Sequence, residues 1–179
     1  MTLSIKPGND LTTDERTQIN EVKATEFNLD AMAERELNDS LFFLIHDGDR
    51  TKAMGQLERV DPVHFGNETF SLMGMGGIIA IEKERGLGSQ IVSAIKDFLA
   101  RYGLLGIGFC LASRSYFYEK NGFQVNRDLI HRFVFIDEGE KITNSDDECV
   151  IIFDGSGNFS MLVSADAISD FILPRPPNW

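Results

Sequence analysis

The sequence predicts one α+β domain. The chain has 179 residues, of which 42% are hydrophobic, and this is enough for a core of ordinary size. Short apolar runs bounded by turn residues, typical of strands, alternate with segments whose apolar residues recur at helical spacing. No internal repeat or linker interrupts them. We therefore expect a single domain over residues 1–179, with an extended tail over residues 173–179, where prolines exclude a helix.

The chain carries more acidic than basic residues. Its formal net charge is −11 at pH 7, so it lacks the basic face that nonspecific nucleic-acid binding requires. An acidic surface raises the local concentration of cationic ligands, and it also keeps a protein in solution without any such partner. We expect no nucleic-acid partner, and the charge leaves open both a cationic ligand and solubility alone.

Neither a membrane segment nor a metal site is expected. No apolar run approaches the roughly 20 residues of a membrane-spanning helix, and the N-terminal residues lack the pattern of a signal peptide. The cysteines, Cys110 and Cys149, form no CxxC motif and no cluster with histidine, which argues against structural zinc and a disulfide framework. We expect reduced thiols, a cytoplasmic protein and Cys110 packed in a strand.

The N-terminal segment predicts two helices. Thr12 and Glu15 have the S/T-x-x-E spacing of a capping box, which starts a helix that runs to about Glu26. A shorter helical segment is expected over residues 30–37.

A β-hairpin is predicted next. The apolar run 41–45 and the run 53–60 are separated by the turn residues Asp47-Gly48-Asp49. Asp61-Pro62 and Gly66-Asn67 mark a loop after it.

A long strand and an amphipathic helix follow. The strand covers residues 70–81 and is interrupted by Gly74, Gly76 and Gly77, and glycines inside a strand indicate a bulge or the close approach of another backbone or a ligand. After a charged turn, apolar residues recur at helical spacing until Gly103 ends the helix. They are Leu87, Ile91, Ala94, Ile95, Phe98 and Tyr102.

The C-terminal segment predicts further strands and a second hairpin. We expect strands over residues 107–111, 123–125 and 131–136, a short helix over 113–121 that Gly122 ends, a polar loop over 137–148, and a hairpin of strands 150–153 and 159–163 around Asp154-Gly155-Ser156-Gly157.

The stretch EKERGLGSQIVSAIKDF, residues 82–98, has the form of an anion site. A strand, a glycine turn and a helix place backbone N–H groups at the positive end of the helix dipole. Gly86 and Gly88 permit close approach, while Lys83 and Arg85 add positive charge. The same glycines also suit a helix that packs tightly on a strand. The stretch fits neither the P-loop nor the dinucleotide fingerprint.

Two motifs resemble the GNAT (GCN5-related) N-acetyltransferases. Residues 83–88, KERGLG, resemble the family's acetyl-CoA loop, Q/R-x-x-G-x-G/A, with Lys83 at the first position. Residues 117–123, FYEKNGF, match the family's F/L-Y-E-K-x-G-F stretch, and residues 77–81 resemble its central strand. One helix and one strand separate the motifs, as in the family. The resemblance runs from about Leu11 to Val125.

The resemblance implies a fold and a co-substrate. The fold is a mixed, mostly antiparallel twisted sheet with flanking helices and a V-shaped splay between the central strands. The co-substrate is acetyl-CoA, without a metal. The cofactor-binding residues that it implies are Ile79, Ala80, Ile81, Lys83, Arg85, Gly86, Leu87, Gly88, Ser89, Ser113 and Tyr118. Leu111 and Arg114 depart from the Asn and Ala of many members, which leaves backbone contacts intact.

Tyr118 is the catalytic residue that the resemblance implies. The family places this hydroxyl near the CoA sulfur, and a phenol can protonate the departing thiolate. Phe117 and Phe123 are expected to pack in the core. A backbone N–H near Ile79 would meet the oxyanion. No general base is assigned: Glu68 and Glu82 are candidates, and a water chain would serve as well.

The expected function is transfer of acetyl from acetyl-CoA to a primary amine of a small, cationic molecule by direct attack in a ternary complex. The alternative is a non-catalytic acyl-CoA-binding sensor, because Gly76 and Gly77 stand where a strand acid would sit. The layout is similar to the aminoglycoside 2′-N-acetyltransferases in Arg85-Gly86, Val92-Ser93-Ala94, Asp146-Asp147 and the final Trp179. A tail with a coincidental tryptophan is the competing interpretation of Trp179. We expect no membrane partner, and a homodimer stays open.

Overall fold

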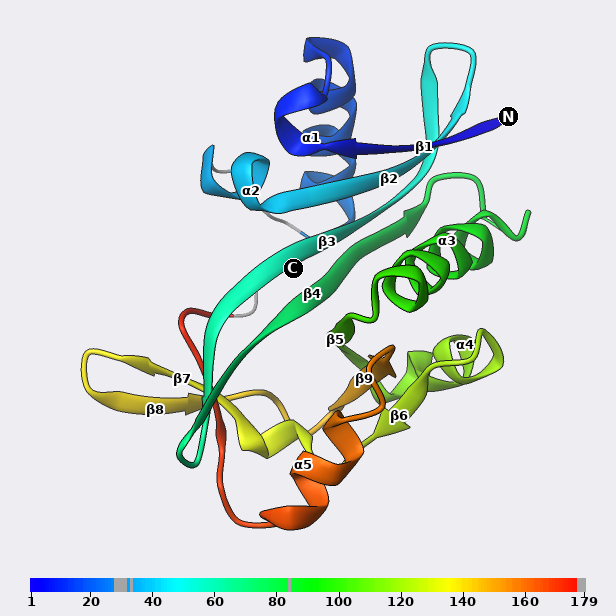
Figure 1. Cartoon of the computed structure of the whole chain (residues 1–179). Coiled ribbons are helices and arrows are strands. Elements are labelled where there is room, and N and C mark those ends of the chain that lie inside the picture. The colour runs from blue at the N-terminus through cyan, green and yellow to red at the C-terminus, as the bar shows by residue number, and fades with distance from the viewer. Residues whose placement is uncertain (28–31, 33, 84, 177–179) are drawn as a thin grey trace. The chain divides into compact units, whose positions relative to one another are not determined.

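The computed structural model describes residues 1–27, 32, 34–83 and 85–176. The strands, shown in Figure 1, are β1 (Thr2–Pro7), β2 (Ser40–Asp47), β3 (Arg50–Phe65), β4 (Glu68–Ala80), β5 (Leu105–Leu111), β6 (Gln124–Asn126), β7 (Phe133–Asp137), β8 (Glu140–Thr143), β9 (Glu148–Asp154) and β10 (Phe171–Leu173). The helices are α1 (Thr13–Phe27), α2 (Glu34–Asp39), α3 (Leu87–Tyr102), α4 (Ser115–Lys120) and α5 (Phe159–Ala165), with short 3₁₀ turns η1 (Gly8–Asp10), η2 (Ala112–Arg114) and η3 (Ile130–Arg132).

The chain forms two compact units. The first contains Met1–Glu58 and Gly76–Ile95, and the second contains Arg59–Met75 and Lys96–Trp179. Strands β3 and β4 and helix α3 each contribute residues to both units.

In the first unit, helices cover a sheet of β1, β2 and parts of β3 and β4. β1 pairs with β2 and β2 with β3, both antiparallel. Ile19 of α1 packs in a buried cluster that also contains Leu44, Met54 and Ile79. Side chains alternate between the faces of a strand, and a Cβ at Gly55 would lie 2.5 Å from Ile91 Cγ2 of α3. α1 and α3 therefore cover opposite faces.

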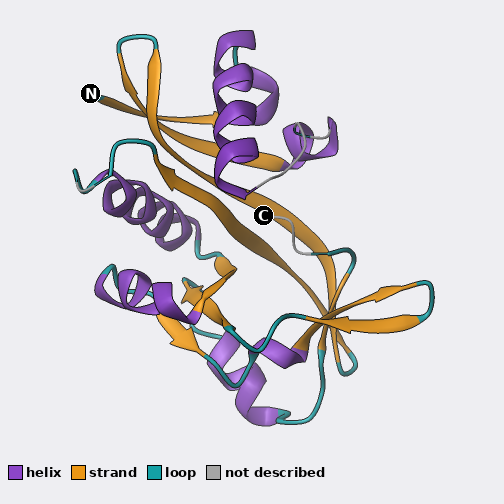
Figure 2. Ribbon diagram, turned by 180° about the vertical axis from the view of Figure 1, so that it is seen from behind, coloured by secondary structure: helices purple, strands orange, loops and turns teal. Residues whose placement is uncertain are grey.

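The second unit carries a mixed sheet, seen from the other side in Figure 2. The strand order is β6-β9-β5-β4-β3-β10-β7-β8. β4 with β5 and β10 with β7 are parallel, whereas β5–β9, β6–β9, β7–β8 and β3–β10 are antiparallel. The core is aromatic: the ring of Phe171 stacks on Phe65 at 4.3 Å and on Phe133 at 4.6 Å. The predicted mixed, mostly antiparallel sheet is confirmed.

The N-terminal elements largely follow the sequence. The Glu15 carboxylate accepts from Thr12 N (2.8 Å) and the Thr12 hydroxyl accepts from Glu15 N (3.2 Å), so the capping box is present. The predicted hairpin is formed by β2 and β3. Of the helical segment predicted over 30–37, α2 begins at Glu34, and residues 30, 31 and 33 lie outside the described residues. β1 was not predicted.

Several C-terminal predictions are wrong. Residues 159–163 form helix α5 and not a strand, because Phe159, Leu162 and Val163 have helical spacing and the Asp154 carboxylate accepts from the N–H groups of Ser156, Gly157 and Phe159. Short apolar runs of this kind do not distinguish helix from strand by periodicity.

The predicted loops are also shorter than expected. The polar loop over 137–148 contains β8, which pairs with β7 around Glu138 and Gly139, both at positive φ. The loop expected from Asp61 to Asn67 shrinks to a turn at Gly66-Asn67 between β3 and β4. Residues 131 and 132 belong to η3, so the strand predicted over 131–136 begins at Phe133. Of the tail, Leu173 is not on the surface: it is buried in β10.

Candidate active site

The turn between β4 and α3 has the backbone geometry of an anion site. Gly86 has φ +70°, a conformation that favours glycine. Gln90 N donates to Gly86 O at 3.1 Å, the first bond of the helix. The N–H groups of Leu87 and Gly88 precede that bond, so α3 itself offers them no acceptor. The first turn contains no acidic residue, and buried Leu87 anchors it in the core. The turn is built to attract negative charge.

The cationic side chains of this turn are paired with carboxylates of the first unit. Lys83 Nζ lies 3.1 Å from Glu26 Oε1, and Glu82 bonds both Lys52 and Arg85. The hydrogen bonds from Lys52 and Arg85 lower the pKa of Glu82. A lowered pKa makes a carboxylate a weaker base, so Glu82 is a poor candidate for deprotonating an amine.

The end of β4 carries a glycine next to buried polar groups. Gly77 has φ +57°, and a Cβ there would lie 3.5 Å from Gln56 Oε1. Lys23 Nζ donates to that same oxygen at 3.3 Å. Because lysine has only donors, this contact fixes the Gln56 amide with its oxygen toward Lys23. Lys23, Gln56 and Glu58 are all less than 4% exposed.

The buried amide beside Gly77 has an unused donor. Among the described residues, Gln56 Nε2 has no hydrogen-bond partner. An unsatisfied buried donor costs about 1–3 kcal/mol, so this amide is a place where a hydrogen-bond acceptor would be stabilised. Residues 54, 56 and 58 of β3 lie on one face of the strand, because side chains alternate between its faces. Helix α1 brings Lys23 to this face, and no sequence pattern predicts that contact.

Backbone alternation shows which N–H groups of β4 face away from β3. Ile81 N donates to Lys52 O of β3 at 2.9 Å. Successive residues of a strand direct their N–H groups to opposite edges, so Ala80 N–H points away from β3, while Ile79 N–H points toward it. Of the residues near Ile79, Ile78 and Ala80 thus direct their N–H groups to the edge of β4 away from β3.

Tyr118 lies in the second unit on α4, which follows β5 and η2. Its half-buried ring packs edge-on against Phe117 (5.0 Å) and Phe123 (6.2 Å). Phe123 N donates to Tyr118 O and Lys96 Nζ to Asn121 O, which fixes the end of the helix. Burial raises the pKa of the Tyr118 hydroxyl above its ordinary value of 10.0. The hydroxyl therefore keeps its proton across physiological pH.

The other residues of the second unit that the sequence singled out are either exposed near η2 or buried in the sheet. Ser113 is exposed in η2, and Arg114 and Leu111 are exposed beside it. Cys110 of β5 lies directly opposite Cys149 of β9, with the two Sγ atoms 3.4 Å apart. Both thiols are buried, and burial raises the pKa of Cys110, so this thiol is packed and unreactive.

Glu68 stands at the opposite end of β4 from Ile79, since it is the first residue of the strand and Ile79 lies near the last. It lines a cavity of the second unit.

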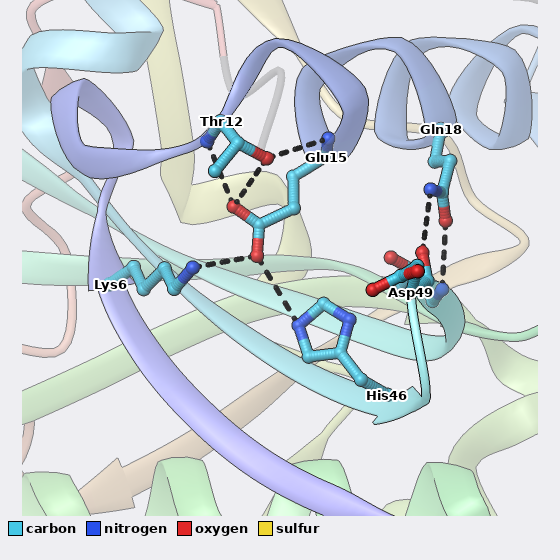
Figure 3. A network of polar contacts seen from close by, with 7 residues as sticks. Lys6, Thr12, Glu15, Gln18, His46 and Asp49 are labelled. Atoms are coloured by element: carbon cyan, nitrogen blue, oxygen red, sulfur yellow. Dashed lines mark hydrogen bonds and ion pairs between the residues drawn. The ribbon is translucent and has the colours of Figure 1, made fainter.

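A second polar cluster of the first unit has a structural role (Figure 3). Glu15 Oε1 accepts from Lys6 Nζ at 2.7 Å and lies 3.4 Å from His46 Nε2, while Oε2 serves the capping box. Burial opposes ionisation of Glu15, but the bonds from Lys6 and Thr12 outweigh it and lower the pKa. Gln18 bonds the backbone of Asp49 and Thr51. The cluster fastens β1 and the β2–β3 turn to α1.

Comparison with solved structures identifies the fold. An acyl-CoA N-acyltransferase from Pseudomonas aeruginosa is 15% identical, with a TM-score of 0.59 over 85% of this chain and 97% of that chain. A GNAT family N-acetyltransferase, YhbS from Escherichia coli, solved in complex with CoA, is 17% identical, with a TM-score of 0.61 over 96% and 87%. The chain has the GNAT fold.

A protein with a different named activity is also similar to the chain. A CoA-dependent acyl-homoserine lactone synthase, BjaI, solved with SAM and isopentyl-CoA, is 10% identical, with a TM-score of 0.57 over 98% of this chain and 95% of that chain. No protein-family model and no curated protein matches the sequence. The resemblance of the two motifs is thus confirmed at the level of the fold.

Within the GNAT fold, the predicted site residues divide between the two units. Residues 79–89 lie in the first, and Ser113 and Tyr118 in the second. Their roles stay predictions, as does the splay between the central strands. Trp179 lies outside the described residues. No helix in the described part of the chain is long and apolar enough to cross a membrane.

Proposed function

We propose that the protein is an N-acetyltransferase that moves acetyl from acetyl-CoA to a primary amine of a small, cationic molecule. The observation that carries this proposal is the position of the two motifs on a GNAT-fold chain. Of the first motif, Lys83, Arg85 and Gly86 precede α3, and Leu87 and Gly88 are its first residues. Residues 117–123 form the C-terminal part of α4 and the turn that follows it. Neighbours of the same fold include an N-acetyltransferase solved with CoA.

The β4–α3 turn would hold the pyrophosphate of CoA. The N–H groups of Leu87 and Gly88 supply donors, and the positive end of the α3 dipole adds to them. Lys83 and Arg85 are both exposed, and surface ion pairs contribute about 0–1 kcal/mol. A phosphate would therefore compete well with Glu26 and Glu82 for these side chains.

The chemical steps follow from thioester aminolysis. The amine nitrogen attacks the carbonyl carbon, and the N–H of Ala80 is a β4 donor suited to meet the developing oxyanion. The C–S bond then breaks, and the sulfur takes a proton from the Tyr118 hydroxyl. The proton released by the nitrogen returns to the phenolate, so Tyr118 ends as it began. The raised pKa of Tyr118 keeps this proton in place before the reaction.

The acceptor is proposed to be cationic because the chain has a net charge of −11. The acyl group is proposed to be acetyl because of the resemblance of the two motifs. One neighbour of this fold is solved with isopentyl-CoA, so longer acyl-CoA thioesters belong in the same assay.

The second candidate is an acyl-CoA sensor without catalysis. It is favoured by Gly76 and Gly77, which occupy the positions on β4 where a catalytic acid would sit. It is also favoured by the lowered pKa of Glu82, which makes this carboxylate a weak base. Both candidates bind acetyl-CoA, and only the first releases thiol when an amine is added.

Two measurements test the proposal. Acetyl-CoA should raise the melting temperature when its concentration exceeds Kd, because ligands that bind only the folded state stabilise it. Free CoA thiol should then appear in proportion to added amine across a panel of polyamines, aminoglycosides, amino acids and peptides. Stabilisation without amine-dependent thiol would leave the sensor. Absence of stabilisation at millimolar acetyl-CoA would contradict both candidates.

A further inference from the structure

The second unit contains a cavity of about 620 Å³ that the proposed chemistry does not use. It lies between the start of β4, the turn from α3 to β5, and α5. Its apolar lining includes Phe70, Leu104, Leu105, Phe159, Met161 and Leu162. Small-molecule sites usually have volumes of roughly 300–1,000 Å³ and mostly apolar linings, so this cavity has the size and lining of a ligand site.

The walls of this cavity are fixed by the fold. Gly155 N donates to Leu104 O at 3.0 Å, and a Cβ at Gly155 would lie 2.8 Å from the carbonyl oxygens of Leu104 and Leu99. This close approach joins the start of α5 to the α3–β5 turn. Phe159 is buried, with its ring 5.4 Å from that of Phe171. The cavity is therefore formed before any ligand arrives.

The electrostatic character of the lining is acidic. Glu68 is the one ionisable side chain among the described residues that line the cavity. Two hydroxyls of the lining donate to carboxylates of residues outside the lining: Ser71 to Asp61 at 2.8 Å and Ser156 to Asp154 at 2.7 Å. No lysine, arginine or histidine of the described chain lines the cavity. Phosphates and carboxylates would find no cationic partner in this lining, whereas a cation would find Glu68.

The cavity is separate from Tyr118 within the second unit. It adjoins Leu104 and Leu105 at the start of β5, whereas α4 follows the end of β5 at Leu111. The length of β5 therefore places the cavity and the start of α4 about 20 Å apart, at a rise of about 3.3 Å per residue.

We propose that this cavity is a second ligand site, which takes a cationic amphiphile: an alkyl or aryl body in the apolar chamber and an ammonium group at Glu68. This site goes beyond the proposed acetyl transfer and does not depend on it.

Octyltrimethylammonium and octanoate test the proposal, because they share an apolar chain, differ in charge and cannot be acetylated on nitrogen. Titration calorimetry below micelle concentrations should give a dissociation constant for the cation about tenfold lower than for octanoate, a difference of about 1.4 kcal/mol. Glu68→Gln should bring the two ligands within about twofold of each other. Glu140→Gln removes the same charge from an exposed site on β8 outside the lining, and it should change nothing.

Two further variants test whether the cavity is the site. Ala165→Trp introduces bulk at an exposed lining position, so the fold should survive, and Leu162→Trp fills the chamber itself. Both should abolish binding of the cation, and acetyl-CoA should not displace it. The proposal is overturned if octanoate binds as tightly as the cation, if Glu140→Gln acts like Glu68→Gln, if folded Ala165→Trp binds normally, or if the cation does not bind at millimolar concentration.

Discussion

The β4–α3 turn and the α5 cavity are two candidate binding regions built in opposite ways. The turn is made by consecutive residues, is flanked by exposed Lys83 and Arg85, and relies on backbone donors. The cavity is made by three segments distant in sequence, is apolar, and has Glu68 as its ionisable lining residue. The first suits an anion and the second a cation. Local backbone geometry can therefore be recognised in a sequence, whereas a chamber assembled from distant segments cannot.

The largest expected effect tests the chemistry attached to the anion site. Tyr118→Phe removes the proposed proton donor and keeps the ring that packs on Phe117 and Phe123. General acid catalysis contributes about 100-fold or more, so turnover should fall by about that factor. The dissociation constant for acetyl-CoA should stay within about twofold. Steady-state thiol release and calorimetry measure the two quantities.

Tyr116 provides the matched control on the same helix. Its side chain is 73% exposed, so Tyr116→Phe should leave turnover unchanged. Equal losses in the two variants, or normal turnover in Tyr118→Phe, would remove Tyr118 from the mechanism.

The second prediction tests whether the backbone conformation of Gly86 is needed for acetyl-CoA binding, apart from the loss of stability that alanine causes at any glycine with positive φ. Gly86 and Gly139 both have positive φ, +70° and +87°, and a Cβ at either would lie within 4 Å of no described residue other than its chain neighbours. Alanine at each position should therefore lower stability similarly, by roughly 1–2 kcal/mol for a left-handed residue. Only Gly86→Ala should also weaken acetyl-CoA binding, by about tenfold.

Denaturant unfolding and calorimetry on both glycine variants test this. If Gly139→Ala weakens binding as much as Gly86→Ala, the turn has no special role in the anion site.

The sequence predicted the elements whose signals are local. The capping box at Thr12 and Glu15, the hairpin of β2 and β3, and the glycine turn before α3 each depend on neighbouring residues, and each is present. The predictions failed where a short apolar run suits both a helix and a strand. Residues 159–163 form a helix because the Asp154 carboxylate accepts from N–H groups of the preceding turn and of Phe159, and because Phe159 packs on Phe171.

The candidate site shows the same division. The sequence identified Lys83, Gly86 and Tyr118 through two short motifs. It did not identify Gln56 and Lys23, because a strand and α1 bring them beside Gly77 only in the folded chain.

The third prediction concerns Asp154, which binds the turn before α5 at the wall of the cavity, and the pH dependence of the stability that it contributes. Partial burial acts to raise the pKa of Asp154, but hydrogen bonds from Ser156, Phe159 and Gly157 outweigh it and lower the pKa below 3.8. This carboxylate therefore contributes stability above pH 3.8, and the contribution is lost as the pH falls through the lowered pKa. Asp154→Asn should cost about 1 kcal/mol at neutral pH, because Phe159 N loses its acceptor.

Urea unfolding of Asp154→Asn and the wild type along a pH series measures this cost. The difference should shrink on acidification. A difference that grows as the pH falls would contradict the assigned role of Asp154.

The smallest expected effect concerns the ion pair between Lys83 and Glu26. Glu26 holds Lys83 Nζ at 3.1 Å, so Glu26→Gln should release the ammonium and strengthen acetyl-CoA binding by about twofold, within the 0.2–1 kcal/mol of exposed pairs. Lys83→Gln should weaken binding by about the same factor. Added salt should reduce both changes, because these side chains are exposed. Calorimetry at low and high ionic strength measures them, and changes of the same sign would show that Glu26 and the phosphate do not compete for Lys83. Opposite changes in acetyl-CoA affinity would show that a cationic side chain contributes to binding at the turn. The cavity differs in this respect, since no cationic side chain of the described chain lines it.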